Sequence, residues 1–406
     1  MNRPRLLVIS PRFLFPMDQG GKIRTANILK RMKDGAFEIV LASPAPPDAD
    51  NFAADIGSVC NRFVGWPEPG RSQLRRIRTL FDPIPVAAAT DRSAAGRRAI
   101  ASLLAEKPDV ALVDFPHAAV LLPERIGAAS AIFTHNVEAE IFARHAEVAR
   151  GPMRLVWRDQ ARKMRIFEGD TLRRFDSVIA VSARDAKALK ALYGLGLVEV
   201  IDTGVDLEFY AFQPPEAAAD PGPGGGRIVF TGAMDWRANI DGIEFLMDEV
   251  WPLVLRARPK AEAMIVGRNP PADLVARAGE RGLAWCFTGF VDDIRPFVAE
   301  SHVYAIPLRV GSGTRIKAFE AMAMGRAVVS TTVGVEGLDV GHETHFLAAD
   351  SAPDFAAAIL RLLGDPALRE RLARAARARV EERFSWAHVA RQFEAICQRA
   401  LELHRT

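Results

Sequence analysis

A glycine-rich turn followed by basic residues is the segment of the sequence best suited to bind an anion. Gly311 and Gly313 follow an apolar run and allow backbone N–H groups to approach a ligand closely. A helix is expected to begin near Thr314 as its N-cap, and a helix start adds about half a positive charge. Arg315 and Lys317 add two full charges beside it. The pattern predicts a phosphate site; the alternative is an ordinary strand-to-helix turn with solvated basic residues.

A carboxylate follows on the same expected helix. Glu320 flanks the predicted buried stripe of Ile316, Phe319 and Ala323, where an unpaired charge is costly. Glu320 either pairs with Lys317 at a spacing of three residues or accepts hydrogen bonds from ribose hydroxyls. A phosphate site and an acceptor for sugar hydroxyls on one helix together predict a nucleotide ligand.

The elements that must position these residues alternate between short apolar runs and longer helical patterns. Near-continuous apolar runs are typical of parallel strands covered by helices on both faces. The pattern predicts an α/β fold with two Rossmann-like doubly wound domains facing each other across a cleft, where such sheets bind ligands. The runs are 6–10, 37–42, 110–113, 131–134, 177–181, 227–231, 263–267, 285–289, 303–306 and 327–330.

A segment rich in proline and glycine divides these runs into two groups. We expect a domain over 1–210, a linker over 211–226 and a second domain over 227–385. The helical pattern of 386–406 is expected to pack back on the first domain.

The composition excludes several classes of protein. With 406 residues, 49% hydrophobic and 25% charged, the chain has the composition of a folded globular protein. Three scattered cysteines predict neither a disulfide framework nor a structural zinc site. No apolar run approaches the roughly 20 residues that cross a bilayer, and the apolar stretch at the N-terminus is too short for a signal peptide. We therefore expect a cytoplasmic protein.

The residues of 303–337, from the Gly-Ser-Gly turn onward, resemble the donor-site signature of family 4 glycosyltransferases. The resemblance extends along nearly the whole chain and is strongest to the sugar transferases associated with bacterial exopolysaccharide gene clusters. The supporting segments are 19–22, 134–138, 203–206, 230–236 and 287–293.

The resemblance implies a GT-B fold and a retaining hexosyltransferase that uses a UDP- or GDP-type sugar. The donor would be held by the second domain, with the first on the acceptor side. The implied acceptor is a lipid-linked or polysaccharide precursor in exopolysaccharide or cell-envelope synthesis. The implied catalytic residues are His135, Arg315 and Lys317, and the implied donor-binding residues are Gly20, Gly21, Gly232, Arg237, Phe290, Gly311, Ser312, Gly313, Thr314 and Glu320. Gly20 and Gly21 would lie over the donor phosphates, and His135 against the donor sugar.

The sequence departs from the family pattern at three positions. Ser312 stands where the family's first glutamate contacts the donor sugar. Ala233 and Ala238 stand where an arginine and a lysine bind the diphosphate, so Arg237 or the basic pair at Arg315 and Lys317 would have to replace them. The leaving phosphate itself can take the acceptor proton, so neither a general base nor a metal or other cofactor is expected.

Two basic clusters bear on the acceptor and on the membrane. Arg154, Arg158, Arg162 and Arg165 form a stripe on one expected helix, and 71–78 form a second cluster. Such helices bind anionic membrane surfaces, and the chain is expected to be peripheral on the inner face of the cytoplasmic membrane. The alternative is a solvated face paired with Asp159 and Glu168.

Two other functions stay open. A nucleotide-sugar 2-epimerase uses the same two-domain arrangement, and a non-catalytic transferase-like partner in polysaccharide assembly would tolerate Ser312, Ala233 and Ala238. A nucleic-acid partner is not expected, because aromatic residues are not interleaved with the basic clusters.

Overall fold

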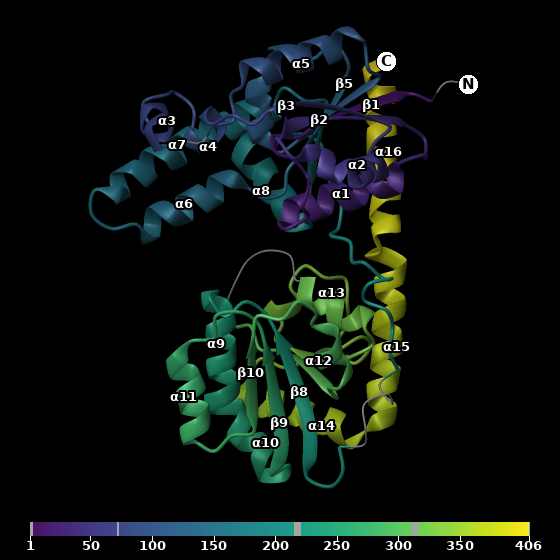
Figure 1. The fold of residues 1–406 in the computed structure, drawn as a ribbon. Coiled ribbons are helices and arrows are strands. Elements are labelled where there is room, and N and C mark those ends of the chain that lie inside the picture. Colours follow the sequence, from purple (N-terminus) through teal and green to yellow (C-terminus); the bar gives the residue numbers. More distant parts are fainter. Residues whose placement is uncertain (1–2, 71–72, 215–220, 311–315, 406) are drawn as a thin grey trace. The chain divides into compact units, whose positions relative to one another are not determined.

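The computed structural model describes residues 3–70, 73–214, 221–310 and 316–405, which form two compact units. Unit 1 comprises residues up to Thr203 together with the final helix from Trp386, and unit 2 comprises Gly204–Ser385 (Figure 1). The chain therefore enters unit 2 before the boundary expected at 210. The reason is backbone pairing, because the N–H of Val205 donates to the carbonyl of Phe384 at 2.7 Å.

Unit 1 is built on a parallel sheet of seven strands in the order β3-β2-β1-β4-β5-β6-β7. The order reverses between β1 and β4, which is where doubly wound sheets bind ligands. All five apolar runs predicted in this half are strands, whereas the edge strands β3 and β7 were not predicted. The strands are β1 (Arg5–Ile9), β2 (Glu38–Ala45), β3 (Arg62–Pro67), β4 (Val110–Asp114), β5 (Ala129–Phe133), β6 (Ser177–Ala180) and β7 (Val198–Val200).

Helices cover both faces of this sheet. Leu6 and Val8 join the core cluster on one face, and Leu7 and Ile9 join the cluster on the other, as the alternation of a strand requires. The helices are α1 (Gly20–Met32), α2 (Ala53–Val59), α3 (Gln73–Thr79), α4 (Val86–Ala89), α5 (Ala94–Ala105), α6 (Glu138–Val148), α7 (Met153–Leu172), α8 (Ala183–Tyr193) and α16 (Trp386–Arg405), with 3-10 turns η1 (Ala49–Phe52) and η2 (Pro116–Leu121).

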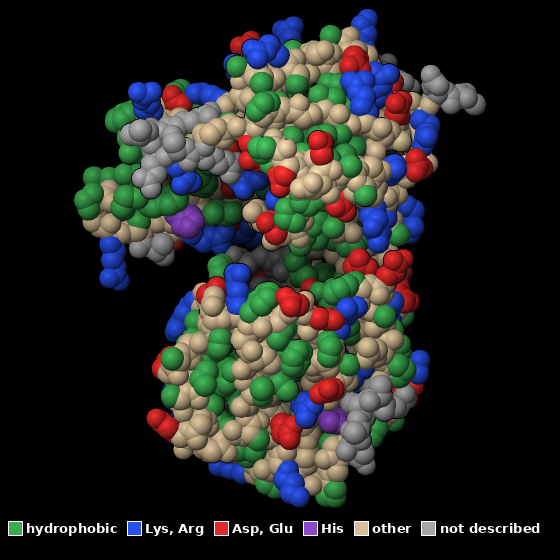
Figure 2. Space-filling model, in the orientation of Figure 1, with side chains coloured by type: hydrophobic (Ala, Val, Ile, Leu, Met, Phe, Trp, Pro, Cys, Tyr) green, Lys and Arg blue, Asp and Glu red, His purple; other side chains and the backbone are tan. Residues whose placement is uncertain are grey.

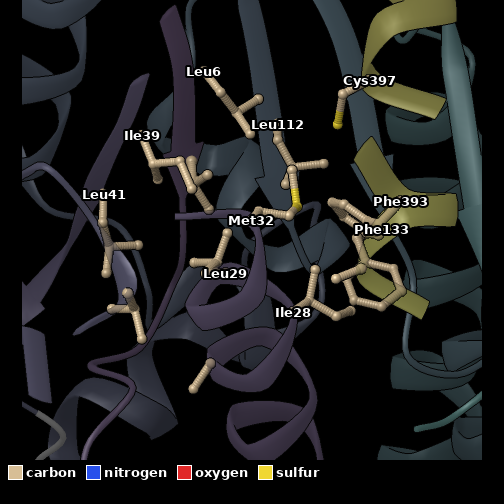
Figure 3. Packing of buried hydrophobic residues seen from close by; sticks show 14 of the residues in the cluster. Leu6, Ile28, Leu29, Met32, Ile39, Leu41, Leu112, Phe133, Phe393 and Cys397 are labelled. Carbon is tan, nitrogen blue, oxygen red and sulfur yellow. The ribbon is translucent and has the colours of Figure 1, made fainter. Parts of the chain in front are cut away.

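The last helix of the chain completes one face of unit 1. Phe393 and Cys397 of α16 point into the cluster that contains Ile28 and Met32 of α1 (Figure 3). The rings of Phe393 and Phe133 meet edge to face with centroids 5.1 Å apart. Helix α16 is therefore part of the core of unit 1.

Unit 2 has a six-stranded parallel sheet in the order β10-β9-β8-β11-β12-β13, which reverses between β8 and β11. All five predicted runs are strands, and the two-residue edge strand β13 was not predicted. The strands are β8 (Gly225–Thr231), β9 (Lys260–Val266), β10 (Trp285–Gly289), β11 (Val303–Ile306), β12 (Ala327–Ser330) and β13 (Leu347–Ala348). The helices are α9 (Arg237–Phe245), continued by a π turn η4 (Leu246–Val250) into α10 (Trp251–Ala257), then α11 (Ala272–Glu280), α12 (Arg295–Ala299), α13 (Ile316–Ala323), the 3-10 turn η5 (Val333–Val335), α14 (Ala352–Gly364) and α15 (Pro366–Arg383).

Within the described ranges, no helix has both the length and the apolar character needed to cross a membrane.

Candidate functional site

A lysine is held against the backbone at the carboxyl end of β8, beside the reversal in strand order of unit 2. Lys317 Nζ donates to Asn239 Oδ1 at 2.8 Å and lies 4.3 Å from the centre of the Phe230 ring. The Nδ2 of Asn239 in turn donates to the carbonyl of Ala233 at 2.8 Å. A Cβ on Gly232 would come within 2.8 Å of Asn239 Nδ2 and 2.9 Å of Lys317 Nζ. The glycine therefore lets a fixed ammonium group approach the strand end, where an anion is best received.

A buried carboxylate lies one helical turn further along α13. The hydroxyl of Tyr210, a residue distant in sequence, donates to Glu320 Oε1 at 2.8 Å. Burial raises the pKa of Glu320, while the hydrogen bond from Tyr210 and the charge of Lys317 partly oppose this rise. Burial also raises the pKa of Tyr210, which keeps its phenol protonated as a donor.

Other predicted donor residues of unit 2 are more exposed. Arg237 begins α9 with its side chain 77% exposed and approaches Glu244 only to 3.8 Å. Phe290 follows β10 and is 73% exposed. Ile316 was expected in the buried stripe of α13, but it is 39% exposed, whereas Phe319 and Ala323 are buried.

Two of the three departures from the family pattern, Ala233 and Ala238, are among the described residues and lie near Lys317. Ala238 is buried on α9, and the carbonyl of Ala233 accepts the hydrogen bond from Asn239. The predicted phosphate turn lies outside the described residues. It comprises Gly311, Ser312, Gly313, Thr314 and Arg315.

Unit 1 contains His135, two residues after the end of β5 and buried among polar partners. Its Nε2 lies 2.6 Å from Asp114 Oδ1, and its Nδ1 lies 3.0 Å from Arg24 Nη1. Asp114, the last residue of β4, also accepts from Ser10 and Thr25 at 3.2 and 3.1 Å. These bonds join β1, β4, β5 and α1 at the reversal in strand order.

The partners of His135 define its protonation state. A guanidinium group only donates, so Nδ1 accepts from Arg24 and the proton lies on Nε2, directed at Asp114. Burial lowers the pKa of His135, and the attraction of Asp114 only partly opposes this effect. Burial also lowers the pKa of Arg24, to about 10, which leaves it charged at neutral pH. His135 is therefore a neutral imidazole with both nitrogens engaged.

The two glycines predicted to lie over the donor phosphates are the first two residues of α1. Gly20 has open space where a Cβ would lie. At Gly21 a Cβ would come within 2.7 Å of the Phe115 ring, and that ring stacks on His135 at 4.0 Å. The close approach at Gly21 thus packs α1 against the histidine.

Two adjoining pockets open at the carboxyl ends of the strands of unit 1. The larger, of about 600 Å³, has mainly Phe and Pro walls that include Phe13 and Phe52. The smaller, of about 280 Å³, lies over β1 and β4 and is lined by polar residues that include His117 and Glu138. Both pockets share Arg12 and Lys22, so they form neighbouring parts of one polar-to-apolar surface.

Sequence reasoning missed several residues of these clusters. Asp114 directly follows the predicted strand at 110–113, and that position is a signal that could have been used. No such signal marks Arg24, Asn239 or Tyr210, because the partner of each is brought into contact only when the chain folds.

Comparison with known proteins identifies the family. Residues 225–365 match the family model described as glycosyl transferases group 1, and residues 19–209 match the model for glycosyltransferase family 4. The chain belongs to the family 4 glycosyltransferases and has the GT-B fold, as the sequence predicts.

Named relatives and a solved structure agree with this assignment. Glycogen synthase of Mycobacterium tuberculosis is 29% identical over 57% of this chain and 56% of its own. Phosphatidyl-myo-inositol mannosyltransferase of Mycolicibacterium smegmatis is 32% identical over 53% of this chain and 55% of its own. The chain thus spans little more than half the length of these curated relatives. Anabaena Alr3699/HepE, solved in complex with UDP and glucose, has a TM-score of 0.63 at 15% identity, covering 97% of this chain and 99% of its own.

Proposed function

We propose that the chain transfers a sugar from a nucleoside diphosphate sugar, of UDP or GDP type, to a hydroxyl-bearing acceptor. The observation that carries the proposal is the pair of charges on α13. Lys317 is fixed at the strand end where an anion is best received, and Glu320 is held by Tyr210 one turn away. An ammonium group for the diphosphate and a carboxylate for the ribose hydroxyls are the two groups that a nucleotide requires.

The relatives support this proposal through their names. Both curated relatives are named as enzymes that build glycans or glycolipids, and the Anabaena protein was solved with UDP and glucose. We propose transfer with retention, on the family resemblance. The positive charges of Lys317 and Arg315 would stabilise the departing diphosphate without a metal ion.

His135 is proposed as a positioning residue. Its ring is enclosed by Phe115 and Phe133 and bonded at both nitrogens, so it fixes the segment after β5. A neutral, fully bonded imidazole is poorly suited to act as an acid or a base.

A lipid-linked or polysaccharide precursor, as in exopolysaccharide or cell-envelope synthesis, is proposed as the acceptor, with the chain bound peripherally to an anionic membrane. On α7, Leu155 is 69% exposed and Ile166 is 53% exposed, and the predicted arginine stripe is exposed beside them. Figure 2 shows hydrophobic and basic side chains together on the part of unit 1 that α6 and α7 form. Of the two carboxylates in the alternative, Asp159 pairs with Arg162 at 3.1 Å, whereas Glu168 is buried and accepts from Tyr193 at 2.6 Å.

Release of UDP or GDP from sugar donors tests the proposed reaction. We expect release from one donor to depend on an added lipid-linked or saccharide acceptor, and to fall by about a hundredfold or more in Lys317→Ala. Lys187→Ala, on an exposed face of α8, is the matched control and should retain activity. Interconversion of the donor without acceptor would indicate the epimerase instead, and no turnover of any donor would contradict the proposal.

A further inference from the structure

The smaller pocket of unit 1 contains a histidine with an unused nitrogen. His117 lies in the turn η2, is about nine-tenths buried and lines the pocket. Its Nε2 has no hydrogen-bond partner among the described residues. Burial and the charge of Arg12 lower the pKa of His117 to about 4, so the ring is neutral at physiological pH. A buried polar atom of this kind needs a partner, and the pocket is where one can enter.

A carboxyl group faces this nitrogen across the pocket. Glu138 Oε2 lies 3.9 Å from His117 Nε2, which is too far for a direct hydrogen bond. Both groups could instead bond to one oxygen placed between them, at about 2.8 Å from each. The pair therefore forms a gap of the size that a single hydroxyl group fills.

The fold holds Glu138 rigidly at this position. Glu138 is the first residue of α6, and its N–H donates to Glu168 Oε1 at 2.9 Å. The N–H of Ala139 donates to the other oxygen of Glu168 at 3.0 Å, and Tyr193 donates to the same carboxylate. Burial, and then the charge of Glu168, raise the pKa of Glu138 to about 7. The groups that face or adjoin it are His117 of η2, Arg12 of the β1–α1 loop, Asn136 before α6, Lys22 of α1, Asp114 of β4 and Glu168 of α7.

We propose that this pocket is an acceptor subsite that holds a hydroxyl group of a sugar or polyol between His117 Nε2 and the carboxyl group of Glu138. A hydroxyl both donates and accepts, so it satisfies a neutral imidazole and a carboxyl group in either protonation state. An ionised phosphate oxygen only accepts, and in the gap it would be repelled by Glu138 when that group is ionised, although Arg12 and Lys22 of the same lining carry charges that attract it. The hydrogen-bonding capacity of the pair, rather than the charge of the pocket, therefore favours a hydroxyl. The assignment of this pocket to the acceptor rests on the proposed function.

Direct binding of simple hydroxyl ligands to the full chain tests the proposal. The probes are methyl α-glucopyranoside, methyl α-mannopyranoside, glycerol and inorganic phosphate, observed by saturation-transfer NMR without any donor. We expect a glycoside to bind and phosphate not to compete with it. We expect binding at least about tenfold weaker in His117→Ala, and also in His117→Phe and Glu138→Leu, which keep more of the side-chain volume but offer no hydrogen bond. Preference for glycerol over the glycosides would indicate a polyol instead of a sugar.

Glu140→Gln is the matched control, because Glu140 lies on the same helix but pairs with Arg184 outside the pocket. The proposal is overturned if no hydroxyl probe binds, if phosphate displaces a bound glycoside, or if the three pocket variants bind like the control. Nucleotide binding by the same variants separates the two hypotheses. If the chain binds nucleotide but no glycoside, the subsite alone is overturned. If the chain binds a glycoside, the variants abolish that binding, and no nucleotide binds, only the proposed donor is overturned.

Discussion

The charged residues of unit 2 depend on a glycine for their position. Gly232 leaves the space in which Lys317 Nζ and Asn239 Nδ2 approach the strand end, and its φ of 159° is one that residues with a side chain rarely adopt. A side chain at this position would displace the tip of the lysine more easily than the buried amide. A side chain at position 232 would therefore move the ammonium group of Lys317 away from the strand end.

Gly232→Ala should therefore weaken binding of the preferred nucleoside diphosphate by about tenfold or more, because the charge-assisted contact to phosphate is lost. Isothermal calorimetry measures this change. The control is Gly279→Ala on the exposed face of α11, where a Cβ meets nothing within 4 Å. It should leave binding unchanged and raise stability by about 0.5–1 kcal/mol. Unchanged binding in Gly232→Ala would refute the assigned role of the glycine.

Glu138 makes stability depend on pH. Its pKa is raised from 4.5 to about 7 on folding, so the folded state binds the proton more tightly than the unfolded state does. The stabilisation by protonated Glu138 is fully present below about pH 4.5 and is lost as the pH rises through about 7. This loss lowers the free energy of unfolding by about 3 kcal/mol.

Glu138→Gln removes that cost. The variant should match the wild type at about pH 4 and exceed its free energy of unfolding at about pH 8, by up to about 3 kcal/mol. Urea unfolding at the two pH values provides the measurement. A difference between variant and wild type that does not change with pH would show that this carboxyl group is not shifted.

At the scale of elements, α16 shows how the end of the chain stabilises the beginning. Phe393 is 1% exposed and packs on Phe133, so Phe393→Ala should lower the stability of unit 1 by about 3–5 kcal/mol. Leu403→Ala is the control on the same helix, because Leu403 is 57% exposed, and it should change stability by less than about 0.5 kcal/mol. Equal effects in thermal unfolding would contradict the packing of α16 on unit 1.

The sequence predicted the central strands of both sheets and missed the edges for a physical reason. A central parallel strand such as β11 is buried on both faces and reads as a continuous apolar run. Edge strand β3 has a single buried residue, Trp66, and contains glycine and proline, so its composition resembles a loop. Edge strand β7 has only three residues, and a run that short is too brief to show an alternation of apolar and polar residues.

The site was predictable where its residues follow a strand or share a helix. His135 follows the predicted run at 131–134, and Lys317 and Glu320 share α13. The partners Tyr210 and Arg24 were not predictable, because 110 and 111 residues separate them from Glu320 and His135. Only folding brings these pairs together.

At the scale of the whole molecule, the exposed arginines of α7 predict binding to anionic lipid. Vesicles of phosphatidylcholine with added phosphatidylglycerol should sediment the chain, and vesicles without it should not. Replacing Arg154, Arg158, Arg162 and Arg165 by Gln should weaken binding by about tenfold or more.

The control for this experiment replaces four exposed arginines of unit 2, Arg268, Arg281, Arg361 and Arg374, with the same change in net charge. Equal loss of binding in both variants would show that only net charge matters and would contradict a specific surface on α7.

The central claim is that unit 2 binds a nucleoside diphosphate through α13. The most direct measurement is thermal unfolding with saturating UDP, GDP, ADP, dTDP or CMP, for the wild type and for Glu320→Ala. One diphosphate at about a hundred times its dissociation constant should stabilise the wild type by about 2.7 kcal/mol, a shift of several degrees. Glu320→Ala should lose this shift, and Glu300→Ala, at an exposed ion pair of the same unit, should keep it. No shift with any nucleotide, or the same shift in Glu320→Ala, would contradict the claim.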